Sequence, residues 1–144
     1  MTHARDAIAG LVHLYAERVD AGDLDGVAAL FADSTYGAEG GPERRGAKEV
    51  LAALRDAIIL HDGVPRTKHV VTNLTIEIDE STGSATARSY FTVFQATPTL
   101  ALQPILAGRY HDRFRRAGNG WQFADRRILI DLTGELRAHV RRRR

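Results

Sequence analysis

The sequence predicts a single α+β domain in which three N-terminal helices pack on one face of an antiparallel sheet. Three observations support this prediction. The chain has 144 residues, which is the usual size of one domain. Its apolar residues recur with a helical period as far as residue 60 and alternate as in strands from residue 70 onward. No internal repeat or linker divides the chain, so the helices and the strands belong to one layered unit.

The helices of the first half follow from apolar stripes and stop signals. The first stripe occupies positions i, i+3, i+4, i+7 and i+11 and comprises Ile8, Leu11, Val12, Tyr15 and Val19. Gly22 is a natural helix stop, and Asp23 is a natural N-cap for a short second helix over 24–31. A glycine-rich segment, 34–46, holds a short strand around Tyr36. It precedes a third helix over 47–60, which Pro65 prevents from resuming.

The second half is predicted to form strands. Residues 70–79 alternate apolar and polar side chains, as in a half-buried strand, and 85–96 return after a turn at 80–84. A tight turn at 117–120 joins 108–116 and 121–132 into a hairpin. The intervening segment, 97–107, contains two prolines and several apolar residues. It could form the apolar lid of a cavity, with a dimer contact or core packing as the alternative.

Composition narrows the classes of function. The chain has no cysteine, which excludes disulfides, thiolate nucleophiles and Cys-ligated zinc. The N-terminus carries both charge signs, and no apolar stretch of about 20 residues occurs, so we expect a cytoplasmic protein with no signal peptide or membrane span. The net charge of +2 depends on four C-terminal arginines, without which 16 basic residues face 18 acidic ones. We therefore expect 136–144 to be a disordered basic tail rather than a nucleic-acid surface, with an anionic contact as the alternative.

Asp20 and His69 are the residues best suited to acid–base chemistry. Asp20 falls at the C-terminal end of the first predicted helix, where the helix dipole disfavours a negative charge and would raise the pKa of a partly desolvated carboxyl. His69 immediately precedes the first clear strand, and an imidazole suits proton transfer near neutrality. Either side chain could instead be exposed to solvent or have its hydrogen bonds made within the fold, with no role in chemistry. No His-x-x-x-His or His-x-His pattern indicates a metal site, and no glycine-rich loop indicates a bound phosphate.

Tyr15, Arg126 and Arg127 could supply hydrogen bonds to such a site. The Tyr15 ring belongs to the apolar stripe, but its hydroxyl needs a partner when buried. It lies about 140° around an ideal helix from Asp20, so both face one pocket only if the helix ends or unwinds there. Arg126 and Arg127 alternate onto opposite faces of the last strand. The one on the helix side must pair with an acid, such as Asp112 or Asp20, or with a ligand.

Several short stretches, in their order and spacing, resemble the SnoaL-like branch of the NTF2-like superfamily over 7–131. They are Tyr15-Ala16, Val19 to Leu24, Leu30 to Asp33, Gly46, Lys68-His69, Asn73-Leu74, Gly108 to Asp112, Gly120-Trp121 and Arg126. Within the superfamily the chain is similar to the scytalone dehydratase, bile acid 7α-dehydratase and polyketide cyclase-like families. The resemblance implies that 1–135 form a cone-shaped domain with three N-terminal helices on a curved, mainly antiparallel sheet.

The resemblance also implies a function. Several lyases of this superfamily use an aspartate at the end of the first helix and a histidine at the start of the next long strand, which Asp20 and His69 match. Tyr15 matches a tyrosine of the bile acid enzymes, and Arg126 or Arg127 matches an arginine of the last strand. The implied protein is a cofactor-independent and metal-independent lyase or isomerase, of the dehydratase or cyclase type, acting as a homodimer on a small cyclic or polyketide-like molecule.

The chain departs from the scytalone dehydratase pattern in one respect. The second histidine of that family would fall within 85–96, where this chain has none. Two other functions therefore stay open for this fold. One is a non-catalytic module that binds a small molecule or assists assembly, and the other is a β-subunit that supports a catalytic partner.

Overall fold

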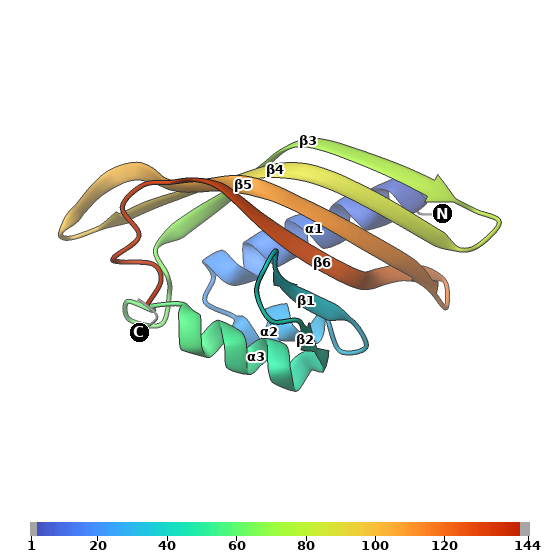
Figure 1. The fold of residues 1–144 in the computed structure, drawn as a ribbon, viewed down its shortest axis with the longest axis horizontal. Coiled ribbons are helices and arrows are strands. Elements are labelled where there is room, and N and C mark those ends of the chain that lie inside the picture. Colours follow the sequence, from blue (N-terminus) through green and yellow to red (C-terminus); the bar gives the residue numbers. More distant parts are fainter. Residues whose placement is uncertain (1–2, 142–144) are drawn as a thin grey trace.

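The structure, a computed structural model that describes residues 3–141, has three helices and one six-stranded sheet (Figure 1). The helices are α1 (Ala4–Asp20), α2 (Leu24–Ala29) and α3 (Gly46–Ala57). The strands are β1 (Thr35–Ala38), β2 (Arg44–Arg45), β3 (Thr67–Asp79), β4 (Ser84–Thr97), β5 (Leu100–Ala117) and β6 (Gly120–Thr133). The predicted α+β class is confirmed.

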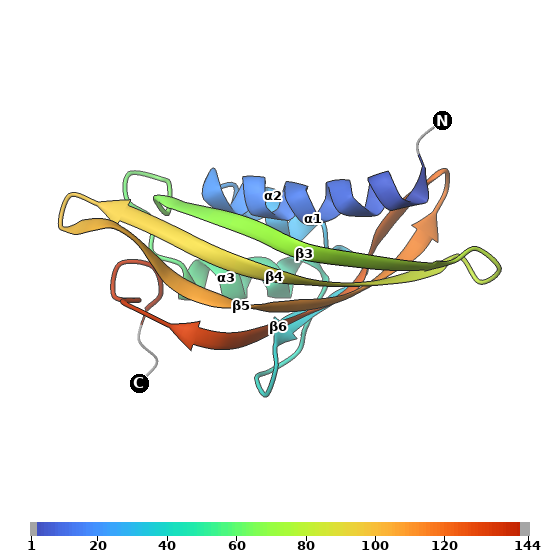
Figure 2. The ribbon, with the colours of Figure 1, turned by 90° about the horizontal axis from the view of Figure 1, so that it is seen from above.

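The sheet is mainly antiparallel and is covered by helices on one face. Its strand order is β2-β1-β6-β5-β4-β3, and every neighbouring pair is antiparallel except β1 and β6, which are parallel. Tight turns connect β3 through β6, so these strands follow one another across the sheet. The two ribbon views show that the sheet is curved and that α1, α2 and α3 all lie against the same face (Figures 1 and 2).

The core forms where the predicted stripe of α1 meets the sheet. Ile8, Val12, Tyr15 and Val19 are all buried, and α1 packs along β3 and β6. Each such side chain contributes roughly 1.5 to 3 kcal/mol when it leaves water. The predicted N-cap of α2 is also confirmed, because the Asp23 carboxylate accepts a hydrogen bond of 2.9 Å from the Gly26 N–H.

The segment 97–107, predicted as a loop, consists mostly of strand. Strand β4 extends to Thr97, the first residue of the segment. A two-residue turn follows, and β5 begins at Leu100. Pro104 lies opposite Phe94 where the register between β4 and β5 shifts, a position at which a strand tolerates a residue without an N–H. Leu100 and Ile105 are buried in the core, Leu106 lines a cavity beside it, and Leu102 is exposed, so the segment combines the two roles considered for it.

The end of α3 differs from the prediction because another part of the chain pairs with the residues that follow it. The helix ends at Ala57 rather than at residue 60. Ile58 is extended and forms an isolated β-bridge with Val140, and the Ile59 N–H donates to the His139 carbonyl at 2.8 Å. We call 136–141 the C-terminal segment.

The prediction that 136–144 are disordered is therefore wrong for the C-terminal segment, while 142–144 lie outside the described residues. The Arg141 guanidinium donates to the carbonyls of Arg55, Asp56 and Ile58, and the Arg141 N–H donates to the carbonyl of Ala57. These carbonyls at the end of α3 would otherwise lack intrahelical partners. Arg141, predicted from the sequence to lie in a disordered tail, thus caps the C-terminal end of α3.

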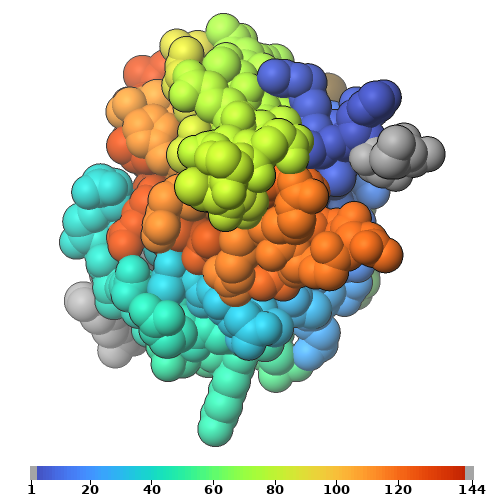
Figure 3. Space-filling view, turned by 90° about the vertical axis from the view of Figure 1, so that its right-hand side faces the viewer, coloured from blue at the N-terminus to red at the C-terminus, as the bar shows by residue number. Residues whose placement is uncertain are grey.

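The turns of two hairpins meet at one end of the molecule. Figure 3 shows the β3–β4 turn (yellow-green) beside the β5–β6 turn (orange). The Arg116 N–H donates to the Gly83 carbonyl at 2.9 Å, and the Arg116 side chain pairs with Glu80. This contact fastens the end of the sheet that lies beside the N-terminus of α1. Within 3–141, no helix has both the length and the apolar composition needed to cross a membrane.

Candidate active site

A cavity of about 450 Å³ lies between α1, α3, the sheet and the C-terminal segment. Most of its wall is apolar and includes Val19, Leu54, Ile58, Phe91, Leu106, Ile128 and Ile130. Its aromatic and imidazole groups with polar atoms are those of Tyr15, Tyr36, His69, Tyr110 and His139. An apolar cavity of this size with a few polar groups is typical of a small-molecule site.

Asp20 and His69 are hydrogen-bonded to each other at the side of this cavity. The Asp20 Oδ1 lies 2.7 Å from the His69 Nδ1, and the Asp20 Oδ2 accepts from the His69 backbone N–H at 2.9 Å. The Thr67 hydroxyl also donates to Oδ1 at 2.8 Å. Both side chains are largely buried, with exposed fractions of 12% for Asp20 and 8% for His69. The two predicted residues therefore meet as a pair, held by the end of α1 and the start of β3.

The pKa of Asp20 is lowered, not raised as the helix dipole alone would suggest. Burial by itself would raise it, but the hydrogen bonds from His69 and Thr67 and the charge of the imidazole outweigh burial. Asp20 is thus a carboxylate, which only accepts hydrogen bonds, so the His69 Nδ1 must carry the donated proton. In the neutral form of the ring this tautomer places the lone pair on Nε2, the nitrogen that can accept a proton.

Tyr15 and Asp20 do not both line the cavity. Tyr15 does, whereas Asp20 lies behind His69 and borders a separate depression of about 460 Å³ between α1 and the start of β3. The helix continues through Asp20, so the angle between the two residues is preserved. The chain turns directly after it at Gly22, whose φ is +76° and whose Cβ position would fall 2.1 Å from the Gly63 carbonyl oxygen. Only glycine fits this turn.

The Tyr15 hydroxyl has the partner that its burial requires. It lies 2.6 Å from the Tyr36 hydroxyl, and both rings line the cavity. Burial raises the pKa of Tyr15 and raises that of Tyr36 well above its ordinary value. Both hydroxyls therefore stay protonated at neutral pH and can donate hydrogen bonds.

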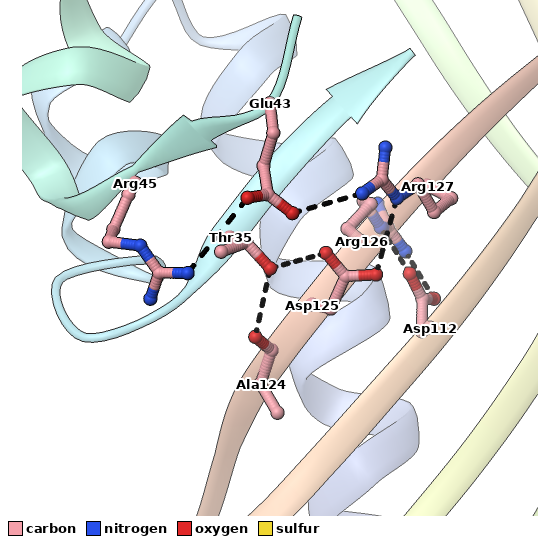
Figure 4. A network of polar contacts seen from close by, with 8 residues as sticks. All are labelled: Thr35, Glu43, Arg45, Asp112, Ala124, Asp125, Arg126 and Arg127. Carbon is pink, nitrogen blue, oxygen red and sulfur yellow. Dashed lines mark hydrogen bonds and ion pairs between the residues drawn. The ribbon is translucent and has the colours of Figure 1, made fainter. Parts of the chain in front are cut away.

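The adjacent arginines of β6 point away from each other (Figure 4), and Arg126 contacts the rings of two tyrosines that line the cavity. Arg126 is fully buried and makes two hydrogen bonds to Asp112, at 2.8 and 2.9 Å. Its guanidinium carbon lies 3.6 Å from the ring centre of Tyr110 and 4.3 Å from that of Tyr15. Of the two acids considered as partners, Asp112 is the one observed.

Arg127 belongs to a surface network instead. Its guanidinium lies 3.0 Å from Glu43 and 3.6 Å from Asp125, and Asp125 accepts a hydrogen bond from Thr35 (Figure 4). The prediction that Arg127 could supply hydrogen bonds to the site is therefore wrong. Side chains alternate along β6, so that of Arg127 points away from the cavity. Arg126 contributes from beneath the tyrosines rather than as part of the cavity wall.

Of the tyrosine and histidine residues that line the cavity, three were not among the predicted site residues. Tyr36 and Tyr110 line it beside Tyr15, and burial raises the pKa of Tyr110 well above its ordinary value. Alternation along the strand would have placed Tyr110 on the same face as Asp112, which is a usable sequence signal. His139 has no such signal, because its place depends on the fold-back of the C-terminal segment.

His139 lies against His69 in a dry environment. Its side chain is 4% exposed, and the centres of the two imidazole rings are 6.2 Å apart. Burial, the largest cause, together with the nearby His69 and His61 lowers the pKa of His139 to about 4, while Asp20 opposes the shift. These three groups, on β3, on the segment after α3 and on α1, are the titratable groups that act on it. At neutral pH His139 is therefore neutral.

The buried His139 is expected to make stability depend on pH between about 6.5 and 4. An unfolded histidine binds a proton below its ordinary pKa of about 6.5, whereas folded His139 does so only near 4, so the stabilisation present above about pH 6.5 is lost as pH falls. The loss reaches about 3 kcal/mol. Urea unfolding should show that the difference in unfolding free energy between wild type and His139→Gln shrinks by this amount. A difference that stays constant between pH 7 and pH 4 would contradict the assignment.

Within 3–141, no group of three or more His, Cys, Asp or Glu side chains is arranged to hold a metal ion. The acid–base groups described above are thus the candidate chemistry of the cavity. A paired carboxylate and imidazole can remove a proton from a ligand, and neutral tyrosine hydroxyls can stabilise the negative charge that develops on an oxygen.

Comparisons with known proteins agree with this architecture. The family model described as the SnoaL-like domain matches residues 1–127. No curated protein matches the chain.

Solved structures resemble the chain over nearly all of its length. An NTF2-like protein with a cystatin-like fold from Novosphingobium aromaticivorans is 23% identical, with a TM-score of 0.72, and the match covers 94% of this chain and 86% of that one. LinA is 20% identical with a TM-score of 0.71, covering 91% and 88%. ActVI-ORFA from Streptomyces coelicolor is 19% identical with a TM-score of 0.73, covering 90% and 98%. At these identities the likeness establishes the shared fold alone.

Proposed function

We propose that this chain, which belongs to the SnoaL-like domain family, is a cofactor-independent lyase or isomerase that acts on a small cyclic ketone. The observation that carries the proposal is the 2.7 Å contact between Asp20 and His69, with the His69 ring forming part of an apolar cavity. A non-catalytic module would have no need of a buried, oriented imidazole at its ligand. The pair instead has the arrangement that general-base catalysis requires.

His69 is assigned as the base. Asp20 fixes its tautomer through Nδ1, so Nε2 takes a proton from the carbon next to the ketone. The electron pair of that C–H bond forms a carbon–carbon double bond, and the carbonyl electrons move to the oxygen as an enolate. In a β,γ-unsaturated ketone the resulting dienolate is reprotonated at the γ-carbon, which completes an isomerisation, whereas in a β-hydroxyketone departure of the β-hydroxyl completes an elimination.

The tyrosines are assigned to the enolate oxygen. The hydroxyls of Tyr15 and Tyr36 form a hydrogen-bonded pair, and both stay protonated because burial raises the pKa of each. The guanidinium of the buried Arg126, which is paired with Asp112, lies against the Tyr15 and Tyr110 rings and helps to fix their positions. Preorganised donors of this kind act strongly where water is excluded.

The substrate is assigned as cyclic and largely apolar because of the cavity wall. Phe91 stacks on Tyr110 with ring centres 4.3 Å apart, and α3 and β6 add aliphatic side chains, while the charged Glu39 and Arg44 line the cavity beside β1. A cavity of about 450 Å³ holds a molecule of two or three fused rings. We also propose a homodimer through the outer face of the sheet, which the exposed Val70 and Tyr90 support.

An elimination assay tests the proposed activity. The bicyclic β-hydroxyketone 3-hydroxy-1-tetralone becomes 1-naphthol when it loses water, and the product is followed by absorbance. We expect the wild type to accelerate this reaction without added metal or cofactor, and His69→Ala to reduce the rate by about a hundredfold or more. In parallel, NMR in deuterated water follows exchange of the α-protons of 1-tetralone, which detects proton removal without elimination.

The matched control is His111→Ala, which removes an exposed histidine on the opposite face of the sheet and should leave both rates unchanged. Absence of both reactions in the wild type, with 1-naphthol still bound, would instead identify the protein as a binding module. Equal rates in wild type and His69→Ala would refute the role of His69.

A further inference from the structure

We propose that His139 is a specificity-determining residue that selects ligands carrying a hydroxyl group beside the reacting carbon. The inference rests on the proposed function, because it assigns a second polar contact in the same cavity. His139 is 4% exposed and forms part of the cavity wall with His69. Its Nδ1 has almost no accessible surface and no hydrogen-bond partner within the part of the chain that the structure describes, so the nitrogen that a ligand in the cavity can reach is Nε2. An imidazole nitrogen that meets an apolar cavity without a protein partner is usually satisfied by a ligand or by water.

The backbone around His139 is held in place by several hydrogen bonds. The carbonyl of the preceding residue, Ala138, lies 2.7 Å from the His61 Nε2 and accepts from the Gln95 amide at 3.0 Å. The His139 carbonyl accepts from the Ile59 N–H at 2.8 Å. The imidazole is therefore presented to the cavity by a fixed piece of chain, and a ligand need not order it on binding.

The chemistry of a neutral imidazole favours a hydroxyl as its partner. Neutral imidazole has one donor and one acceptor nitrogen, and a hydroxyl can both donate and accept, so it matches either nitrogen. A carboxylate fits less well, because the ionised Asp20 already lies beside the His69 ring. A purely apolar ring leaves the nitrogen unpaired. The low pKa of His139 is consistent with this role, because it keeps the ring neutral at physiological pH.

A hydroxyl bound by His139 would also lie close to His69, given the 6.2 Å between the two ring centres. In an elimination, His69 takes the proton from carbon, the C–O bond breaks as the double bond forms, and the departing hydroxide takes that proton to leave as water. The same imidazole thus serves both proton transfers, and His139 positions the leaving oxygen beside it. The assigned substrate class is a β-hydroxyketone on a fused ring.

Two stable aromatic ligands separate this inference from catalysis. The compound 1,3-dihydroxynaphthalene differs from 1-naphthol only by a hydroxyl at the position of the leaving group, and neither can undergo the elimination. Calorimetry under anaerobic conditions should show that the wild type binds the dihydroxy compound about tenfold more tightly, as expected for one net hydrogen bond. His139→Phe should bind the two compounds with equal affinity, so that the tenfold preference is lost.

Two further variants and one control complete the test. Gln places its amide near the position of Nε2 and Asn near that of Nδ1, so His139→Gln should restore part of the preference, whereas His139→Asn should not. His111→Phe, on the outer face of the sheet, should keep the full preference. A preference that survives in His139→Phe would overturn this inference and leave the proposed function intact. Failure of the wild type to bind either naphthol would overturn both.

Discussion

Replacing Asp112 with leucine is expected to lower the free energy of unfolding by about 3 to 5 kcal/mol. Asp112 and Arg126 are both inaccessible to solvent, and Asp112 accepts two hydrogen bonds from the guanidinium. Burial by itself would lower the pKa of Arg126, but the charge and hydrogen bonds of Asp112 outweigh it and raise the pKa above its ordinary value. Without Asp112 the arginine is still charged, and it is left unpaired beneath two aromatic rings.

Urea unfolding measures the effect against a matched pair on the surface. Arg109 and Asp131 make the same two-fold hydrogen-bonded contact with side chains about two-fifths exposed, so Asp131→Leu should cost less than about 1 kcal/mol. The double variant Asp112→Leu/Arg126→Met should recover much of the lost stability, because no unpaired charge then stays buried. A cost below about 1 kcal/mol for Asp112→Leu alone would show that the site admits water or relaxes around the arginine.

The second large effect is expected in catalysis, where Asp20→Asn should lower kcat by about 10³- to 10⁴-fold with a much smaller change in KM. The size follows from analogous acid–base pairs, in which an amide in place of the carboxylate leaves the geometry intact but favours the wrong imidazole tautomer. Asp20 accepts three hydrogen bonds, from the His69 ring, the His69 N–H and the Thr67 hydroxyl. In the variant, an amide N–H that faces the His69 ring can donate a hydrogen bond only to a lone pair on Nδ1. The proton of the neutral ring would then be on Nε2.

Two measurements test this explanation. Steady-state kinetics on 3-hydroxy-1-tetralone give kcat and KM, and ¹⁵N NMR of the imidazole nitrogens reports the tautomer of His69 without requiring turnover. Asp23→Asn is the control, since asparagine caps a helix as well as aspartate does and Asp23 lies outside the cavity. A kcat reduced less than tenfold in Asp20→Asn, or a His69 tautomer that does not change, would show that His69 acts without help from Asp20.

The fold was predictable because it depends on patterns that are local in the sequence. The stripe from Ile8 to Val19 is mostly buried as its helical spacing indicates, and the alternation over 85–96 appears in β4. In β3 a register shift between Thr72 and Thr75 interrupts the alternation predicted over 70–79, so Val70 is exposed while Ile76 is buried. Asp23 caps α2 as expected. The errors have one common cause. Pro104 lies at a register shift inside β5 and the basic C-terminal segment pairs with the residues after α3, so distant parts of the chain override the local signal.

The candidate site was predictable only in part. Residue type and position marked Asp20 and His69, and alternation guaranteed that Arg126 and Arg127 would face opposite sides. Neither residue type nor alternation could show which of the two arginines faces inward. That choice depends on the register between β5 and β6, in which Asp112 lies opposite Arg126. The same limit applies to the contact between the Tyr15 and Tyr36 hydroxyls, which are contributed by α1 and β1.

By itself the sequence determined the class of the fold, the helical and strand segments, and the residues best able to carry acid–base chemistry. Periodicity, capping and side-chain type are properties of neighbouring residues, so they can be read along the chain. Only the tertiary structure decided that Asp20 stands behind His69 rather than in the cavity, that Arg126 is neutralised by Asp112, and that His139 closes the site from the C-terminal segment. Each of these depends on contacts between residues far apart in the chain, and such contacts are set by packing and strand register rather than by local propensity.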